Sequence, residues 1–474
     1  MKDFVLKVKS FFKIEERGST FTKELLGGLT IFLAMVYILP VNSAILEEAG
    51  MSFAAVFAAT AIAAAIASLI MGIFANYPIG LASGMGVNAF FTYTVVLSLG
   101  FPWEEALAAV FVSGVLFLII SLSGLREKVI TAIPRNLKIA VGAGIGFFIA
   151  FIGLKNAGVI VGQSETLVQL GELQQPTVLL ALFGIILVFV IHSLDSKISR
   201  FAIIISILVT GFLGVFLGLI FPSLSAAMPA FSSVSLGGIG DISQTFGKAF
   251  TALPSLLANP MAYAVIFAFL FVDFFDTTGT LVAVGHDAGL LNEDGELIGG
   301  KRALIADASG TVAGSILGTS TVTSYIESTT GIKQGSRTGL SATVVGVLFI
   351  VSLLFYPLFS FVGSIPVTLA EGLPYESVIF VSPATSLALV YVGALMVSQL
   401  KEIDWKDNVA VITTFMVILI MMLAFSISDG IAFGFIFYVI LMVASKRYKE
   451  VNPVMYVLAG LFIVYYLIKF IAFI

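Results

Sequence analysis

Four carboxylates lie within stretches of sequence that are otherwise apolar. Asp273 and Asp276 stand in FLFVDFFDTTGT, Asp307 in LIADASGT and Glu327 in TSYIEST. A carboxylate at the centre of a membrane helix costs about 2.5–3.5 kcal/mol on insertion scales and by default marks a substrate or ion pathway. Neither Lys nor Arg occurs at a comparable depth in these stretches. Structural salt bridges are therefore a poor explanation for the four acids.

The spacing of the acids suggests proton exchange. Asp273 and Asp276 are three residues apart, so on a helix they share one face and reach one cavity. Crowded carboxylates away from water hold a proton more readily than solvated ones. We therefore expect this pair to carry a coupled proton, with Asp307 as a further candidate. Because Asp307 is close to Arg302, the alternative is that it only caps or braces its helix.

Composition places these acids in a membrane protein. The chain has 474 residues, is 59% hydrophobic and only 11% charged, and its mean hydropathy is +1.10. Soluble proteins carry about 25% charged residues, so a soluble globular class is excluded. No cysteine and two histidines are present, so we expect no metal site and no cofactor. The net charge of −4, with basic residues in short clusters, gives no support for a nucleic-acid partner.

The apolar runs form two sets of seven. A membrane-spanning helix needs about 20 apolar residues, and the first set lies at 25–46, 53–75, 80–99, 104–124, 137–154, 177–194 and 199–221. The second set lies at 260–284, 302–318, 320–335, 339–362, 384–400, 408–426 and 428–445. A further run, 454–473, is either a fifteenth span or a peripheral helix. Alternatively, 408–426 and 428–445 are half-depth helices.

Basic residues support this topology. With a cytoplasmic N-terminus, 21 of the 24 Lys and Arg residues fall on the cytoplasmic side, as the positive-inside rule requires. Seven spans per half make the two halves inverted repeats, which is typical of secondary transporters that bind substrate near the bilayer midplane. Residues 1–23 predict an amphipathic helix on the lipid surface; the alternative is a disordered cytoplasmic tail.

The third run of each set is interrupted. These runs read NYPIGLASGMGVNAFFTYTVV and GSILGTSTVTSYIESTTGIKQG, rich in Gly, Ser and Thr. Such paired interruptions indicate a transporter's binding site, although small residues can also serve only close helix packing. Asn88 offers a donor and an acceptor there, unless it caps the following half-helix. Phe90 and Phe275 flank the polar groups and are either stacking surfaces for a planar ligand or ordinary packing residues.

Four stretches carry a family resemblance. The segments ERGSTFTKELLGGLTIFLAMVYILPVN, GMGVNAFFTYTVV, FVDFFDTTGTLVAVG and ASGTVAGSILGTSTVTSYIESTTGI resemble AzgA-like purine permeases of the nucleobase:cation symporter superfamily. The resemblance covers nearly the whole chain. It implies an all-α membrane protein with about 14 spans in two inverted seven-span repeats, short extended segments in spans 3 and 10, and separate core and gate domains. It also implies proton-coupled uptake of adenine, guanine or hypoxanthine into the cell across the inner or plasma membrane.

The resemblance also implies the site. The family's important positions match Gly86, Asn88, Asp273, Asp276, Asp307 and Glu327. We expect Glu327 to be the leading purine ligand, with Asp276 second. The remaining expected substrate-binding residues are Asn88, Gly86, Phe90, Phe275 and Thr323. The expected proton-coupling residues are Asp273, Asp276 and Asp307.

The domain expectations follow the two repeats. The predicted units are an N-terminus 1–23, core 24–126, gate 127–221, linker 222–259, core 260–362 and gate 363–474. Two departures from the family are visible. The first span ends in VNS where many relatives have VNP, and EGLPYESVIFV (371–381) looks inserted before the twelfth span.

Other functions stay open from sequence alone. The same fold can carry another small planar or anionic solute, such as uracil, xanthine or a sulfate-like anion, and sodium can replace the proton. An anion transporter would want a positive site, a cation channel would not need acids in one half only, and an enzyme would need a nucleophile with its base or a metal. The expected partners are a purine nucleobase, protons, membrane lipid and a possible second copy in a homodimer.

Overall fold

The protein is described by a computed structural model that covers residues 2–123, 132–163, 165–194, 197–230, 238–292, 297–359, 365–368 and 378–473. Helices dominate, and within these ranges ten are long and apolar enough to cross a membrane. The helices of the first half are α2 (Phe21–Met35), α3 (Ile38–Glu48), α4 (Phe53–Ile70), α6 (Trp103–Ser123), α8 (Arg135–Asn156), α9 (Pro176–Ser193) and α10 (Ala202–Ile220). The chain is therefore a multi-pass membrane protein, as its composition predicts.

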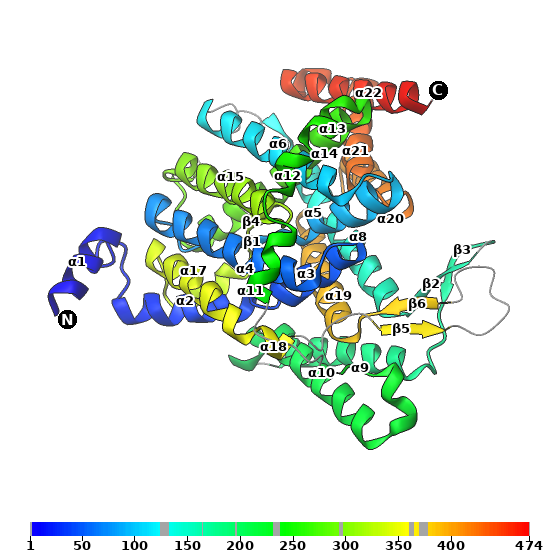
Figure 1. Cartoon of the computed structure of the whole chain (residues 1–474). Coiled ribbons are helices and arrows are strands. Elements are labelled where there is room, and N and C mark those ends of the chain that lie inside the picture. The colour runs from blue at the N-terminus through cyan, green and yellow to red at the C-terminus, as the bar shows by residue number, and fades with distance from the viewer. Residues whose placement is uncertain are drawn as a thin grey trace.

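The second half repeats this pattern. Its long helices are α14 (Pro260–Asp287), α15 (Gly300–Leu317), α17 (Gly339–Ser352), α19 (Pro383–Val397), α20 (Asn408–Leu423) and α21 (Ile427–Ala444). The last two contain 16 and 18 residues. The final helix, α22 (Pro453–Phe473), packs against α14 and α21. Figure 1 shows α22 at the edge of the bundle, at the opposite end from α9 and α10.

Both interrupted runs contain a short strand. In the first half β1 (Leu81–Ser83) precedes α5 (Met85–Ala89) and the π-helix η2 (Phe90–Ser98). In the second half β4 (Val322–Ser324) precedes α16 (Ser328–Lys333). The two strands pair antiparallel with each other, and every residue in both is buried. The prediction of extended segments in spans 3 and 10 is confirmed, because backbone at this depth finds its hydrogen-bond partner in the other strand.

One hydroxyl holds the start of each strand. Ser68 on α4 accepts from the N–H of Leu81 at 2.9 Å and donates to the carbonyl of the same residue at 3.1 Å. Thr311 on α15 does the same for Val322, at 3.2 and 3.1 Å. The two halves therefore position their strands in the same way, with a hydroxyl from the helix that precedes the interrupted run.

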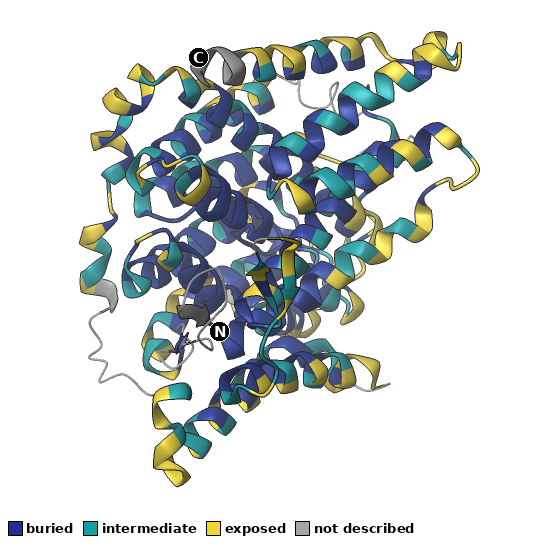
Figure 2. Ribbon diagram, turned by 90° about the vertical axis from the view of Figure 1, so that its right-hand side faces the viewer, coloured by how far each residue is buried: buried dark blue, intermediate teal, exposed yellow. Residues whose placement is uncertain are grey.

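The helices pack in two groups. One group, here called the core helices, consists of α2, α3, α4, α6, α15 and α17, with the strand pair between them. The second, here called the gate helices, consists of α8, α9, α10, α19, α20 and α21. Helix α14 contacts members of both groups. Figure 2 shows that the most buried helices lie inside the bundle, while exposed residues face outward. Those outward residues include large apolar side chains such as Leu219 and Phe216.

Smaller elements lie at the periphery. Helix α1 (Lys2–Phe12) is formed, as the amphipathic pattern predicts, and Phe12 packs on Leu340 of α17. Two hairpins are present in the described residues: β2–β3 (Ile160–Gln163 with Leu167–Leu170) connects α8 to α9, and β5–β6 (Ile365–Thr368 with Val378–Val381) precedes α19. Short helices between the halves are α11 (Gly238–Asp241), α12 (Lys248–Thr251) and α13 (Leu253–Ala258); α18 (Tyr356–Phe359) follows α17. The expected boundaries at 126/127 and 362/363, and residues 371–377 of the apparent insertion, lie outside the described residues.

Candidate functional site

The strand pair brings the third and tenth runs together. Ala82 lies opposite Thr323, and Leu81 lies opposite Ser324. The pairing continues beyond the strands, because Gly84 N–H donates to Thr321 O at 3.1 Å and Tyr325 N–H donates to Gly80 O at 3.1 Å. The Tyr325 hydroxyl also donates to Ser83 O. Side chains that follow one strand are thereby fixed relative to the other.

Glu327 lies just after β4, at the start of α16. Its Oε1 accepts a 2.6 Å hydrogen bond from the Tyr37 hydroxyl, which comes from the turn between α2 and α3. Tyr37 is completely buried, whereas Glu327 retains some accessible surface. Asp276 lies within electrostatic range of Glu327. The two acids expected to bind the purine are thus brought into one cluster.

Asp276 faces the first interrupted run. The Thr323 hydroxyl donates a hydrogen bond to its carboxylate. A Cβ on Gly84 would lie 2.8 Å from Thr323 Oγ1 and 2.9 Å from Asp276 Oδ2. Since Cβ contacts under 3.0 Å are essentially not observed, only glycine allows this approach. The backbone of Gly84 therefore forms one wall of the acid cluster.

Asp273 and Asp307 lie deeper and are held by hydroxyls. Thr311 Oγ1 is 3.3 Å from Asp273 Oδ2, and Asp307 accepts from Thr277 at 3.0 Å and from Ser324 at 3.2 Å. Asp273 is 1% exposed and Asp307 is 0% exposed. These two acids have no accessible surface for a ligand, whereas Asp276 and Glu327 do.

The alternative for Asp307 involved Arg302. The Arg302 guanidinium lies over the ring of Phe74, 5.9 Å from its centroid. Asp307 instead joins Thr277 of α14 to Ser324 of β4. It therefore links two elements of the site.

Asn88 and Gly86 have different surroundings. Asn88 is fully buried; its Oδ1 accepts from Ser83 Oγ at 3.0 Å, and its Nδ2 has no partner among the described residues. It occupies the interior of α5 and does not cap it. A Cβ on Gly86 would lie 2.8 Å from Ile145 Cγ2 of α8. Gly86 thus permits close approach of a gate helix, in line with the alternative that small residues in this run serve helix packing.

The two expected stacking residues lie among other rings. Phe90 makes an edge-to-face contact with Phe269 at 4.9 Å, and Phe275 makes one with Phe435 of α21 at 5.7 Å. Both are buried. The ring contacts therefore agree with the packing alternative; a stacking role for either residue stays a prediction.

Four site residues escaped sequence reasoning. Tyr37, Gly84 and Asn42 are core residues, and Tyr391 lies on gate helix α19 within electrostatic range of Glu327. Asn42 Nδ2 donates to Thr60 at 2.7 Å and to Thr319 at 2.9 Å. Its place in the unusual VNS sequence was a visible signal. The other three reach the site through contacts between distant parts of the chain, which spacing alone does not reveal.

A second polar cluster joins the core and gate helices away from these acids. Asn156 of α8 donates from Nδ2 to Glu48 Oε1 and to the Tyr93 hydroxyl, each at 2.9 Å. Tyr93 in turn donates to Glu48 at 2.9 Å. Nearby, the Thr94 hydroxyl donates to Phe425 O at 3.1 Å. We call Glu48, Tyr93 and Asn156 the seam cluster, since it crosses the boundary between the two groups.

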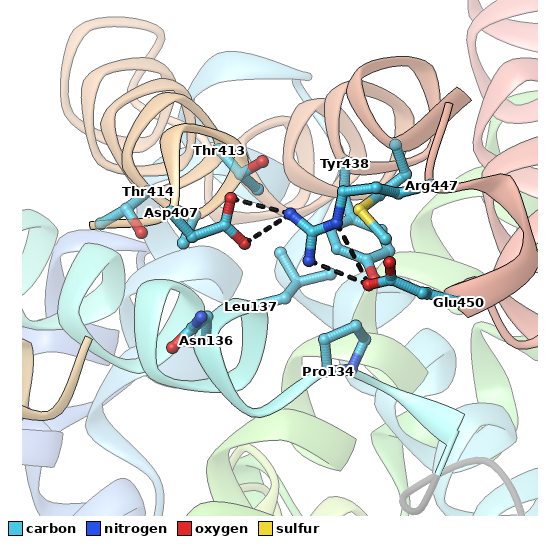
Figure 3. Close-up of a pocket in the computed structure, with 11 residues that line it drawn as sticks. Pro134, Asn136, Leu137, Asp407, Thr413, Thr414, Tyr438, Arg447 and Glu450 are labelled. Carbon is cyan, nitrogen blue, oxygen red and sulfur yellow. Dashed lines mark hydrogen bonds and ion pairs between the residues drawn. The ribbon is translucent and has the colours of Figure 1, made fainter. Parts of the chain in front are cut away.

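A separate cavity lies among the gate helices. Its volume is about 160 Å³, and it lies between α8, α20 and α21. Figure 3 shows Arg447 bridging two acids at its edge: both Asp407 oxygens accept from Nη1 at 2.9 and 3.0 Å, and Glu450 accepts from Nε and Nη2. These two acids hold the pKa of Arg447 above its usual value. The residues that line this cavity include none of the expected site residues.

Comparisons with solved structures give the fold. The transmembrane domain of a cyanobacterial bicarbonate transporter, BicA, superimposes with a TM-score of 0.61 over 86% of this chain and 96% of that one, at 14% identity. The murine anion transporter Slc26a9, in an inward-facing state, superimposes with a TM-score of 0.56 over 93% of this chain and 72% of that one, at 11% identity. At this identity the likeness shows a shared architecture and leaves the substrate open.

Comparisons of sequence are more specific. A guanine/hypoxanthine permease of Bacillus subtilis is 42% identical over 97% of this chain and 99% of its own length. An adenine permease of Escherichia coli is 39% identical over 95% of this chain and 94% of its own length. Residues 22–433 match the family described as "Permease family". The chain therefore belongs to this permease family, as its four motif segments predict.

Proposed function

We propose that this protein is a secondary active transporter that imports purine nucleobases together with protons. The observation that carries the proposal is the acid cluster: the strand pair brings Glu327 and Asp276 together beside the backbone of Gly84. Relatives at 39–42% identity over nearly the whole chain are named for guanine, hypoxanthine and adenine, which supports purines as the substrate class.

The groups in the cluster suit a purine. A purine presents ring N–H donors and ring nitrogen acceptors, and guanine and hypoxanthine also present a carbonyl. Glu327 and Asp276 accept from N–H groups, while the unpartnered Nδ2 of Asn88 is a donor. A buried site with such fixed groups rejects a ligand that leaves them unpaired. The same acids disfavour a sulfate-like or bicarbonate-like anion.

Hydroxyl partners suit a carboxyl group that changes its protonation state. A hydroxyl can donate to a carboxylate or accept from a carboxylic acid. Thr311 is such a partner for Asp273, and Thr323 is one for Asp276. Thr311 also bonds both backbone groups of Val322. A proton on Asp273 would therefore change the hydrogen bonds that hold β4, which is how proton binding would affect the substrate site.

Transport then requires the site to face each side in turn. We propose that the core helices carry the strand pair across the membrane as a rigid body against the gate helices, in an elevator-type movement. The division of helix contacts into two groups supports this, and so does the seam cluster, a small set of hydrogen bonds that such a movement can break. One proton moved through 100 mV supplies about 2.3 kcal/mol, or roughly fifty-fold accumulation.

Uptake into proteoliposomes tests the proposal. With an imposed inward pH gradient, labelled guanine, hypoxanthine or adenine should accumulate, and uracil should not. Accumulation should fall as the external pH rises above neutrality, collapse with a protonophore and persist without sodium. Uptake that needs sodium and resists the protonophore would overturn the proton assignment alone. If the protein took up uracil or an anion but no purine, the assignment of purines as the substrate would be overturned.

A further inference from the structure

His192 makes an unexpected contact with the interior of the gate helices. It is one of two histidines in the chain and lies in the last turn of α9, where its side chain is exposed. Its Nδ1 lies 2.8 Å from the hydroxyl of Tyr391 on α19. The two rings are steeply inclined at 75°, with centroids 5.2 Å apart. Tyr391 itself is only 6% exposed.

Tyr391 also interacts electrostatically with the acid cluster. Its hydroxyl lies within electrostatic range of Glu327 and of Tyr37, the residue that donates to Glu327. Helix α19 contacts α3, which begins directly after Tyr37. Tyr391 is therefore a phenol from the gate helices that contacts His192 directly and interacts electrostatically with Glu327.

The protonation state of His192 Nδ1 determines the orientation of the Tyr391 hydroxyl hydrogen. When Nδ1 is unprotonated it accepts the Tyr391 O–H, and the phenol oxygen then presents only lone pairs to the acid cluster. When Nδ1 carries a proton it donates to the phenol oxygen, and the phenol O–H is then free to donate to another acceptor, including a carboxylate of the acid cluster. In both cases the hydrogen bond restrains rotation of the hydroxyl. Without it, the hydroxyl samples both directions.

We propose that His192 is a positioning residue for the purine site, acting through the Tyr391 hydroxyl. The inference rests on the proposed function, because it concerns the same site. It adds a residue of a gate helix to a site whose two accessible acids come from α14 and from the segment after β4. It also assigns a role to an exposed histidine that touches no purine itself.

A double-mutant cycle on purine binding tests the inference. Hypoxanthine, guanine and adenine affinities are measured for the purified full chain with His192→Leu, Tyr391→Phe and the double variant. A hydrogen bond of about 0.5–1.5 kcal/mol corresponds to about 2- to 12-fold in affinity. Each single variant should weaken binding of the best-bound purine by that amount. In the Tyr391→Phe background, His192→Leu should have no further effect, because its only route to the site is gone.

Two matched variants separate positioning from packing. His192→Asn places an amide near the position of Nδ1 and should restore binding to within about two-fold of wild type, since its oxygen can accept the Tyr391 proton. His286→Leu, at the exposed end of α14, should leave binding unchanged.

The outcomes are distinct. Three results would each overturn the role of His192. The effects of the two single variants could be additive in the double variant. His192→Asn could bind purine as weakly as His192→Leu does, or His192→Leu could bind purine with wild-type affinity. Absence of purine binding by the wild-type chain would overturn the proposed function instead. Because thermal unfolding of each variant is measured in parallel, a loss of fold is not mistaken for a loss of positioning; a destabilised His192→Leu is replaced by His192→Phe in the same cycle.

Discussion

The two interrupted runs share a backbone and differ in chemistry. Each begins with a strand whose first residue is held at both N–H and carbonyl by one hydroxyl, Ser68 for β1 and Thr311 for β4. The third residue after β1 is Gly86, and the third after β4 is Glu327. The inverted repeat thus supplies a symmetric scaffold, and only its second half carries the acids.

The difference separates two requirements of a transporter. Small residues of the first run allow close approach, of Gly84 to Asp276 and of Gly86 to Ile145 on gate helix α8. Glu327 and the hydroxyl residues of the second run, with the acids of α14 and α15, supply charge and exchangeable protons. We therefore expect substitutions of the acids to abolish transport. Substitutions in the first run should only reduce transport, through a steric clash or the loss of a hydrogen bond.

The largest expected effect comes from Glu327 and Asp276, the two acids with some accessible surface. Glu327→Gln and Asp276→Asn keep the shape of each side chain but remove the charge, and we expect each to lower purine uptake at least about 100-fold, because charge-assisted hydrogen bonds and coupling are both lost. Uptake into proteoliposomes is compared at equal amounts of folded protein. Full transport by both variants would remove the acids from the site.

Asp273→Asn should separate binding from accumulation. Asp273 is buried, and its Oδ2 lies 3.3 Å from the Thr311 hydroxyl, which also bonds Val322 of β4, so purine affinity should stay within about three-fold of wild type. Concentrative uptake under a pH gradient should nevertheless be lost, because the side chain can no longer take up a proton. Equal losses of affinity and accumulation would place Asp273 among the ligands, and an intact pH-driven gradient would exclude it as the proton carrier.

Substitutions of Gly84 and Gly86 should affect different steps of transport. Gly84→Ala places a methyl group 2.8 Å from Thr323 Oγ1 and 2.9 Å from Asp276 Oδ2, so purine affinity should fall by about ten-fold or more. Gly86→Ala places one 2.8 Å from Ile145, so the maximal rate of uptake should fall while affinity is kept. Equilibrium binding and initial rates on both variants check this. The opposite assignment, or identical phenotypes, would contradict it.

Asn88 should give the smallest effect. Asn88→Ala removes the unpartnered Nδ2 and the Oδ1 that accepts from Ser83. Ser83→Ala, the matched control, keeps Nδ2 of Asn88 and removes the bond between these two side chains, together with the bonds of Ser83 Oγ to Thr321 O and Thr319 Oγ1. If Nδ2 meets the purine, Asn88→Ala should weaken binding by about 3- to 10-fold and Ser83→Ala by less than about two-fold. If Asn88→Ala and Ser83→Ala weakened binding equally, the role of Asn88 would be to stabilise the strand and not to bind the purine.

Much of the architecture is predictable from local pattern. Apolar run length gives the spans. Glycines in both third runs, with Pro78 in the first run and a series of Ser and Thr in the second, indicate the two strands. The four acids stand out because charge within an apolar run is costly. The bonding partners do not stand out: Tyr37 lies 290 residues from Glu327, and no periodicity connects them.

The structure adds packing contacts that the sequence pattern does not specify for several of the expected site residues. Gly86 matched a family position but faces Ile145 of a gate helix, while its neighbour Gly84 lies against Asp276. A residue-type pattern cannot distinguish two glycines in one short segment, because the direction in which each missing Cβ would point depends on the local backbone. Likewise, the sequence predicts that Phe90 and Phe275 flank the site, and in the structure their rings contact Phe269 and Phe435, respectively.

Equilibrium purine binding to Glu327→Gln and Glu450→Gln most directly tests where the substrate lies. Glu450 belongs to the polar cavity of the gate helices and bonds Arg447, so it serves as an acidic control outside the strand pair. The account predicts that wild type and Glu450→Gln bind guanine or hypoxanthine with the same affinity, within about two-fold, and that Glu327→Gln binds neither. Retained binding in Glu327→Gln with loss in Glu450→Gln would move the substrate to the gate cavity and contradict the central claim.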